Sequence, residues 1–425
     1  MQRIGADPTR AVLEPVGGQG PQKLVTEFGG AIAAGDIDVA MIIGSEPGST
    51  ARYFADRDDK PDFTEHVDGQ LEDRGHQLFS YIDEYTIKHG LTGAPVQYGL
   101  MENARRGRLR LSIEDYRQQM AELFAPFSKV AAKNPLSSSP VERSVVEIAT
   151  VSDENRMISD PYPRLLVARD QVNQGAAAVL MSVAAARRLG VPEEKWVYLH
   201  GHADMIEQGL MERVDLGRSP AAVAAAHEAL RVAGLGVDDI ATFDLYSCFP
   251  FPVVIICEAL GLAADDPRGL TLTGGLPYFG GPGNSYSLHG IAETVAEMRD
   301  RPGCFGFVGA NGGIMSKYSV GIYSTEPAAW KADRSGELYE EIKQLPTVPV
   351  TAEADGPATI ETYSVRYDWP TRTGIIVGRL DSDNCRFLAT SEDQDLVALL
   401  SHDDHPFGTP IAVRSTERGN RASLA

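Results

Sequence analysis

The sequence predicts an α/β fold followed by a small all-β C-terminal domain. Two observations predict the α/β fold. A helix and a short apolar strand follow each other between residues 20 and 46, and strands and helices alternate again between residues 175 and 323. A third observation predicts the all-β domain, since several short strands separated by turns occur after residue 357. The 425 residues leave room for about two or three domains and a sizeable core.

The first α/β unit begins with a helix over residues 20–34. A glycine-proline pair opens it, apolar residues recur near helical spacing, and Gly35 ends it. The continuous apolar run that follows, residues 36–46, is typical of a buried parallel strand. A further short strand is predicted at residues 11–13.

Residues 50–150 differ in character and are predicted to form an insertion outside the parallel sheet. They are rich in charged and aromatic residues and contain an amphipathic helix that begins at Ser112, where acidic residues follow at once. The segment ends in a loop rich in proline and serine at residues 134–140.

The second α/β unit begins near Gly175. Ser219 and Pro220 start a long alanine-rich helix that ends at Gly234. Further strands are predicted at residues 176–182, 195–200, 242–246, 304–309 and 318–323, and further helices at 183–189, 248–260 and 287–299.

The chain changes in kind after residue 335. A linker rich in proline and glutamate covers residues 336–357, and the alternating pattern beyond it predicts a small β-barrel over residues 358–425. Its strands are expected at residues 358–367, 374–380, 386–389 and 410–413. The last ten residues or so are expected to be frayed.

Charge and composition argue against several kinds of partner. Lys and Arg number 39 and Asp and Glu 59, so the net charge is −20 and phosphate backbones or anionic lipids would be repelled. We expect no nucleic-acid partner and, since no apolar run is long enough, no membrane span. Four scattered cysteines without a CxxC pair favour a reducing cytoplasm. The pair His200 and His202 lacks a second group of ligands, and no metal site is expected.

Several segments in a fixed order resemble the thiolase superfamily. They are residues 15–25 with 33–46, 162–192, 244–253, 273–295 and 307–323. More narrowly, the chain is similar to actinobacterial thiolase-like proteins of the acetyl-CoA acetyltransferase type that carry an extra C-terminal domain. The resemblance implies two similar α/β halves, each with a five-stranded sheet, and a loop domain inserted in the first half.

The resemblance suggests four parts of the chain. Residues 1–160 form the first half, with the loop domain at about 50–150, and residues 161–335 form the second half. The linker at 336–357 and a barrel at 358–425 that resembles an OB-fold follow. The family's first two strands and two helices have no counterpart before Ala11, so the first half is expected to be incomplete.

The resemblance also indicates which positions carry thiolase chemistry. The position of the nucleophilic cysteine reads Gly17, the histidine of the Gly-His-Pro motif reads Gly281, and the acid/base cysteine reads Ala310. Tyr246 begins the segment that resembles the Asn-Glu-x-Phe motif and could donate a hydrogen bond. Because glycine and alanine can neither form an acyl-enzyme nor transfer a proton, we expect a protein that binds CoA or acyl-CoA thioesters and lacks thiolase chemistry.

Two alternatives remain open. The chain could be an active acyl-CoA acetyltransferase with displaced catalytic residues: Cys248 at a helix start, His289 on the helix after the glycine loop, and Tyr246. Cys248 is more typical of a buried thiol, and His289 of a structural histidine. The chain could also be a non-catalytic subunit that completes its fold with a protein partner or a second copy.

The expected ligand is CoA or an acyl-CoA thioester, with no tightly bound cofactor. Its phosphates need local cations in so acidic a chain, and Arg105, Arg106 and Arg108 form the densest basic cluster. A solvated helix end would have the same composition. The resemblance places this cluster in the loop domain, which holds the nucleotide part of CoA. The glycine turns would let the pantetheine arm pass close to the main chain; their expected contacts are Gly280, Gly283, Gly312 and Gly313. A GxGxxG loop is absent after the first strand, so a nicotinamide cofactor is not expected.

Overall fold

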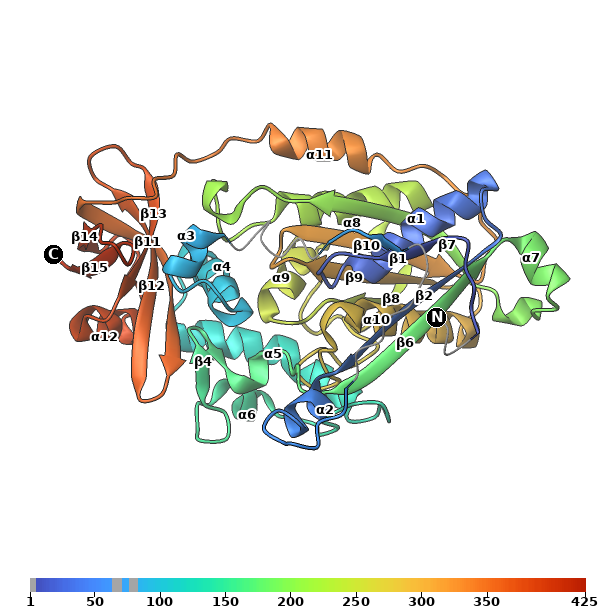
Figure 1. The fold of residues 1–425 in the computed structure, drawn as a ribbon, viewed down its shortest axis with the longest axis horizontal. Helices are drawn as coiled ribbons and strands as arrows, with labels where there is room; N and C mark the ends of the chain where they lie inside the picture. Colours follow the sequence, from blue (N-terminus) through green and yellow to red (C-terminus); the bar gives the residue numbers. More distant parts are fainter. Residues whose placement is uncertain (1–4, 63–70, 76–82) are drawn as a thin grey trace.

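The computed structural model describes residues 5–62, 71–75 and 83–425. Figure 1 shows an α/β body next to a C-terminal β-barrel, with α11 (Ser335–Lys343) running along the top towards the barrel. α4 (Ala94–Leu109) lies between the barrel and the body, and α5 (Ile113–Ala131) lies below it in this view. The predicted α/β class with an all-β C-terminal domain is confirmed.

The larger sheet of the body has the strand order β7-β10-β9-β8. Its strands are β7 (Tyr198–Ile206), β10 (Lys317–Ser324), β9 (Phe305–Gly312) and β8 (Ile240–Leu245). β10 is antiparallel to β7 and β9, whereas β8 and β9 are parallel. α8 (Pro220–Ala233) packs on β7 and β10 and also contacts α9 (Pro250–Leu260), while α10 (Tyr286–Asp300) packs on β9.

The place of a fifth strand beside β8 is taken by irregular chain. The Leu245 amide donates to the Leu270 carbonyl oxygen at 3.0 Å, as a neighbouring strand would require. The next amides, those of Leu272 and Thr273, donate instead to the buried carboxylate of Asp244. Because this side chain takes the donors of the segment, the sheet has four strands over the described residues rather than five.

A second sheet pairs β2 (Val39–Pro47) with β6 (Asn173–Met181). α1 (Gly20–Ala34) and α10 contact strands of both sheets, so these two helices form the layer between them. Ala40 and Ile42 of β2 are buried, whereas Met41 and Ile43 are about half exposed. The predicted buried parallel strand at residues 36–46 is therefore wrong: β2 is antiparallel to β6, and only one face of it is covered.

The predicted insertion is mainly helical from residue 83 onwards and lies outside both sheets, whereas its residues 63–70 and 76–82 lie outside the described part of the chain. Ser112 caps α5 by accepting a hydrogen bond from the Asp115 amide at 3.0 Å, and Tyr116, Phe124 and Phe127 are buried beneath it. Among the described residues up to 195, the other strands and α-helices are β1 (Ala11–Leu13), which is parallel to β3 (Leu71–Asp73), α2 (Gly48–Tyr53), α3 (Glu84–Lys88), α6 (Val145–Ala149), β4 (Met157–Ser159), β5 (Tyr162–Pro163) and α7 (Val183–Arg188).

The C-terminal domain is a closed barrel. β11 (Gly356–Asp368) pairs with β12 (Thr371–Leu380) on one side and with β14 (Pro410–Arg414) on the other, and β13 (Arg386–Ser391) and β15 (Arg421–Leu424) close the ring. α12 (Gln394–His402) packs against β11, β12 and β15. The prediction that the last residues are frayed is wrong, because β15 pairs with β14 and β13. The first part of the predicted linker is α11.

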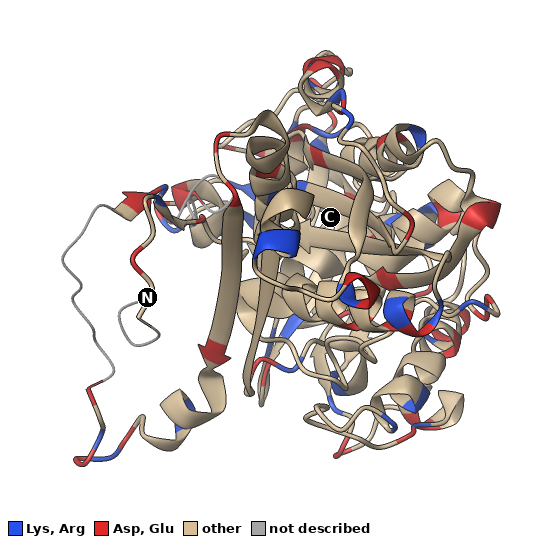
Figure 2. Ribbon diagram, turned by 90° about the vertical axis from the view of Figure 1, so that its right-hand side faces the viewer, with Lys and Arg blue, Asp and Glu red and all other residues tan. Residues whose placement is uncertain are grey.

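The surface of the body carries both signs of charge. Figure 2 shows basic and acidic positions interspersed along its helices and loops. Over the described residues, no helix is both long enough and apolar enough to span a membrane.

Candidate functional site

A glycine loop before α1 is fixed to the segment before α10. The Gly17 amide donates to Asn284 Oδ1 at 2.8 Å, and the Gly20 amide donates to the Gly17 carbonyl oxygen at 3.0 Å. Ser287 Oγ donates to the Gly18 carbonyl oxygen at 2.6 Å. These bonds hold the start of α1 against the glycine loop at residues 280–283, where the resemblance places thiolase chemistry.

Neighbouring side chains fill the space beside the glycines of this loop. A Cβ on Gly17 would lie 2.1 Å from Gln19 Oε1, and a Cβ on Gly312 would lie 1.7 Å from the same atom. A Cβ on Gly18 would lie 2.3 Å from the Tyr246 hydroxyl. The Gln19 amide therefore occupies the space that side chains at positions 17 and 312 would need.

We use the name glycine-lined site for this loop, the segment 280–283 and the β9–β10 turn. Gly280 has a φ of 132° and abuts the Gln174 amide, and Gly283 has a φ of 49° and abuts Glu46 Oε1. Both positions have positive φ angles, which favour glycine. Burial raises the pKa of Glu46. Gly313 has a φ of 55° in the turn after β9.

Three buried polar atoms at this site have no hydrogen-bond partner among the described residues. They are Gln19 Oε1, Gln174 Oε1 and His289 Nε2. The Gln174 amide nitrogen is satisfied, since it donates to the carbonyl oxygens of Leu136 and Phe279. Because buried polar atoms are normally paired, these three mark places where a bound water or ligand would supply the missing partner.

Tyr246 and Cys248 follow β8 and are buried under α4. Tyr246 packs edge-on against Tyr286 at 5.2 Å between ring centroids, and burial raises its pKa well above the usual value. Asn311 Nδ2 lies 3.7 Å from Cys248 Sγ and donates to the Tyr98 hydroxyl at 2.6 Å. Burial raises the pKa of Cys248 to about 12 despite hydrogen bonds from its neighbours. A thiol in this state is a poor nucleophile.

His289 lies on α10 with its ring edge-on to Phe279 at 5.3 Å. Burial lowers its pKa to about 4, so the imidazole is neutral at physiological pH. Its Nε2 has no hydrogen-bond partner among the described residues and so makes no hydrogen bond to Cys248. The two side chains predicted as a displaced nucleophile and base are therefore not joined through that nitrogen.

Backbone hydrogen bonds hold the other two substituted positions, Gly281 in a loop and Ala310 in β9. The Gly281 amide donates to the Arg169 carbonyl oxygen at 2.8 Å, and Ala310 pairs with Ser319 in the ladder between β9 and β10. A Cβ on Gly281 would meet no atom closer than 3.3 Å, so this position is less crowded than Gly17.

Arg106 is a core residue between α4 and the barrel. It is fully buried, and four of its N–H groups donate to protein oxygens. The acceptors are Asn103 Oδ1, the carbonyl oxygens of Leu111 and Asp404, and the Tyr363 hydroxyl. This geometry leaves Arg106 without access to the phosphate for which the sequence suggested it.

Arg105 and Arg108 lie one turn apart and share Glu258 of α9. Arg105 Nη2 lies 2.7 Å from Glu258 Oε1, and its Nη1 donates to the Tyr116 hydroxyl at 2.9 Å. The contacts of Arg108 are longer, at 3.4 Å to Glu258 and 3.7 Å to Asp215. Arg108 is therefore the member of the cluster most easily drawn to another anion.

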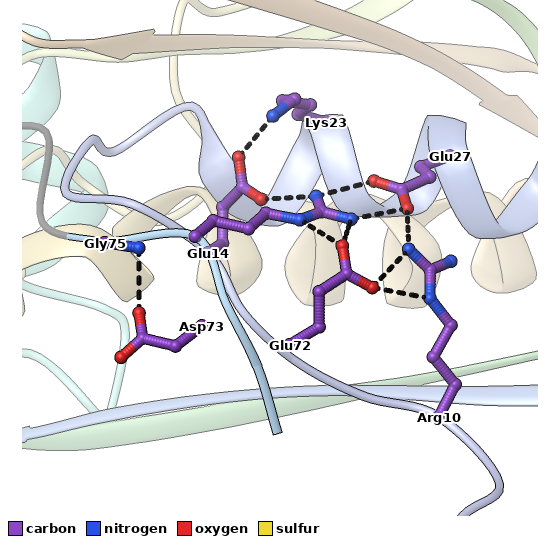
Figure 3. A network of polar contacts seen from close by, with 8 residues as sticks. Arg10, Glu14, Lys23, Glu27, Glu72, Asp73 and Gly75 are labelled. Carbon is purple, nitrogen blue, oxygen red and sulfur yellow. Dashed lines mark hydrogen bonds and ion pairs between the residues drawn. The ribbon is translucent and has the colours of Figure 1, made fainter. Parts of the chain in front are cut away.

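The outer side of α1 is held by ion pairs close to the glycine loop. Figure 3 shows the Arg74 guanidinium between Glu14, Glu27 and Glu72. Its nitrogens lie 2.7–2.8 Å from oxygens of these carboxylates, and Lys23 also pairs with Glu14. Glu14 stands three residues before Gly17, so the network fixes the chain where it enters the site.

Sequence reasoning missed the amides of the site. Gln19, Gln174, Asn284 and Asn311 shape it, yet none belongs to the side-chain types usually sought for catalysis. Gln19 and Asn311 each lie within a glycine motif, and that adjacency was the available signal.

Comparison with known proteins places these features in context. Residues 337–418 match the family model of the thiolase-like protein type 1 additional C-terminal domain. The chain is 63% identical to a monomeric SCP2-thiolase like protein type 1 (STLP1) from Mycobacterium smegmatis, with a TM-score of 0.89 over 100% of this chain and 86% of that chain.

More distant proteins share the fold. An acetyl-CoA acetyltransferase from Methanothermobacter thermautotrophicus is 26% identical over 235 residues; the match spans 52% of this chain but only 58% of that relative's length. The Ltp2-ChsH2(DUF35) aldolase has a TM-score of 0.52 at 19% identity, over 73% of this chain and 78% of that chain. The dimeric peroxisomal thiolase of Saccharomyces cerevisiae has a TM-score of 0.50 at 14% identity, over 73% and 75% of the two chains.

Proposed function

The chain belongs to the SCP2-thiolase-like protein type 1 family, and from that premise we propose that it binds a CoA thioester at the glycine-lined site without thiolase chemistry. The observation that carries the proposal is the Gln19 amide in the space that side chains at Gly17 and Gly312 would need. No nucleophile stands at position 17, and the buried Cys248 with its raised pKa is a poor substitute.

The unpaired atoms of the site support binding of the pantetheine part. Gln19 Oε1 and Gln174 Oε1 are buried acceptors without donors among the described residues. A pantetheine arm carries two amide N–H groups, which are donors of the required kind. Supplying a buried acceptor with a donor removes a desolvation cost of about 1–3 kcal/mol.

Arg108 is the cation we assign to the phosphate end. Tyr98 touches Asn311 at the site, and Arg108 follows ten residues later on α4, about 15 Å along the helix axis. An extended pantetheine arm spans such a separation. Arg108 can exchange its long contacts for a phosphate oxygen, whereas Arg105 is held more tightly and Arg106 is enclosed.

Calorimetric titration with CoA and dephospho-CoA tests the binding proposal. We expect both to bind, and we expect Arg108→Gln to weaken CoA binding about tenfold, as loss of one charge-assisted contact would. Arg110→Gln is the matched control, because Arg110 is an exposed arginine two residues further on. Wild-type protein that binds neither ligand would refute the proposal, and equal loss in both variants would remove Arg108 from it.

The absence of thiolase chemistry is tested separately by thiolysis of acetoacetyl-CoA. We expect no turnover near the 1–10³ per second typical of enzymes. Iodoacetamide labelling of the native protein gives a second measurement: the half-buried Cys304 and Cys385 should react before the buried Cys248 and Cys257. Rapid labelling of Cys248 that acetyl-CoA prevents would instead favour the displaced acetyltransferase site.

One observation favours a second candidate, a non-catalytic subunit completed by another chain. The outer face of the β2–β6 sheet exposes Met41, Ile43 and Val179 by 47–55%. Neighbouring exposed apolar side chains of this kind often mark a protein interface. The Mycobacterium smegmatis relative is monomeric. Light scattering gives the mass of the purified chain, alone and after chemical cross-linking in the cell. A mass of one chain in both samples would contradict the second candidate, and a larger mass would support it.

A further inference from the structure

A cavity of about 530 Å³ lies where the insertion meets the C-terminal domain, away from the glycine-lined site. We call it the junction cavity. α5 and α6 form one wall, and the end of α12 with the loop that follows it forms the other. It is lined by Ile113, Glu114, Arg117, Gln118, Val146, Ala149, Thr150, Val151, Ser401, His402 and Asp404.

Arg117 is the arginine of this cavity, and its guanidinium makes no hydrogen bond or ion pair within the described residues, although its charge acts on the buried carboxyl group of Asp160. Its side chain is half-buried, and its Nε is buried without an acceptor in the described part of the chain. A buried guanidinium N–H without an acceptor costs free energy, which a bound acceptor would recover. The planar guanidinium suits a carboxylate in particular, because two parallel N–H groups can face its two oxygens.

The two acidic residues of the cavity do not fill that role. Asp404 Oδ1 accepts a hydrogen bond from the Ile113 amide at 2.9 Å, so this carboxylate is used to hold the start of α5. Glu114 is exposed to water in the first turn of α5. His402, with its imidazole at the end of α12, adds a second nitrogen donor to the cavity wall.

The apolar part of the lining indicates what the rest of the ligand must be. Val146 is 70% exposed and Val151 is 43% exposed, and both border the cavity together with Ile113 and Ala149. An alkyl chain laid along these side chains would cover apolar surface that is now in water.

From the cavity, the Arg117 guanidinium without a hydrogen-bond acceptor among the described residues, and the apolar wall, we propose that the junction cavity binds a small monocarboxylate with an alkyl chain. The carboxylate contacts Arg117, and the chain lies against Val146, Ala149 and Val151. This site is separate from the proposed CoA site and shares none of its residues.

The test is an NMR titration of the full chain with hexanoate, followed through the methyl groups of Val146, Val151 and Ile113. We expect saturable shifts with hexanoate, shifts at least tenfold weaker at equal concentration with hexylamine, and an affinity for hexanoate reduced at least tenfold by Arg117→Gln. Lys129→Gln is the matched control, since Lys129 is exposed on the same helix outside the cavity and its loss should change nothing.

A second variant keeps the test decisive if Arg117→Gln folds poorly. Val146→Glu places a negative charge at an exposed position of the cavity mouth and should also weaken hexanoate binding at least tenfold. The proposal is overturned if hexanoate shifts none of these methyl groups, if hexylamine binds as well as hexanoate, or if both variants bind hexanoate like the wild type.

Discussion

The glycine-lined site and the junction between α4 and the barrel use polar groups in opposite ways. At the glycine-lined site, the reactive side chains that the thiolase resemblance requires are absent, and two amide oxygens there have no hydrogen-bond partner among the described residues. At the junction, the sequence concentrates charge, and the structure uses that charge for internal contacts, with Arg106 bonded to four protein oxygens. A cluster of cations in a sequence therefore shows where charge lies but not whether a ligand can reach it.

The largest expected effect comes from replacing Arg106, the arginine that is buried between α4 and the barrel. Arg106→Ala leaves four buried or partly buried acceptors without their donor, two of them on the barrel side, and should lower the free energy of unfolding by about 3–5 kcal/mol. Urea denaturation measures this, with exposed Arg110→Ala as the control that should change it by less than about 0.5 kcal/mol. If the two variants lost equal stability, Arg106 would not be a structural residue and could serve a ligand after all.

A second prediction at the junction concerns pH. Asp160 is buried beside β11, where its carboxylate accepts a hydrogen bond from the Tyr367 hydroxyl at 3.2 Å. Burial raises its pKa to about 7, and the hydrogen bond from Tyr367 and the charge of Arg117 only partly oppose this. The folded state therefore holds a proton that the unfolded chain releases near pH 4, so the contribution of Asp160 to stability falls between about pH 4 and pH 7.

Asp160→Asn should remove this loss of stability with rising pH, because asparagine does not titrate. Its amide oxygen can still accept a hydrogen bond from the Tyr367 hydroxyl. The variant should match the wild type near pH 4 and exceed it by about 2–4 kcal/mol at pH 8, because each tenfold difference in proton affinity between the folded and unfolded states corresponds to about 1.4 kcal/mol. Urea denaturation at the two pH values measures the difference, and the many other titrating groups cancel in the comparison. A difference independent of pH would contradict a raised pKa in the folded state.

The same contrast explains what the sequence could and could not predict. Ser112, Ser219 and Gly234 act through neighbours three or four residues away, so the ends of α5 and α8 were predictable from local pattern. Tyr363 on β11, which accepts a hydrogen bond from Arg106, lies 257 residues further along the chain, and no local sequence pattern predicts this contact. The strand β15 was missed for the same reason, because four residues become a strand only through pairing with β14 and β13.

At the glycine-lined site, the resemblance indicated which positions had lost reactive side chains but not what replaced them. Gln19 reaches Gly312 through the fold, nearly 300 residues away in sequence. The glycines were therefore predictable as backbone features, whereas the amides that fill the space beside them depended on tertiary packing.

The smallest expected effect tests how tightly that space is filled. An alanine at Gly18 would place its Cβ 2.3–2.6 Å from the hydroxyl and ring of Tyr246, which is buried and packed against Tyr286 and so has little room to move. Gly18→Ala should lower the free energy of unfolding by about 1–3 kcal/mol, as overpacking in a core does. Gly336→Ala in α11 is the matched control, because a Cβ there meets nothing within 4 Å and alanine favours a helix. Thermal or urea denaturation measures the stability of the two variants. Equal stability would mean that the Tyr246 side chain moves at little cost and that the site has room for a larger side chain than the structure indicates.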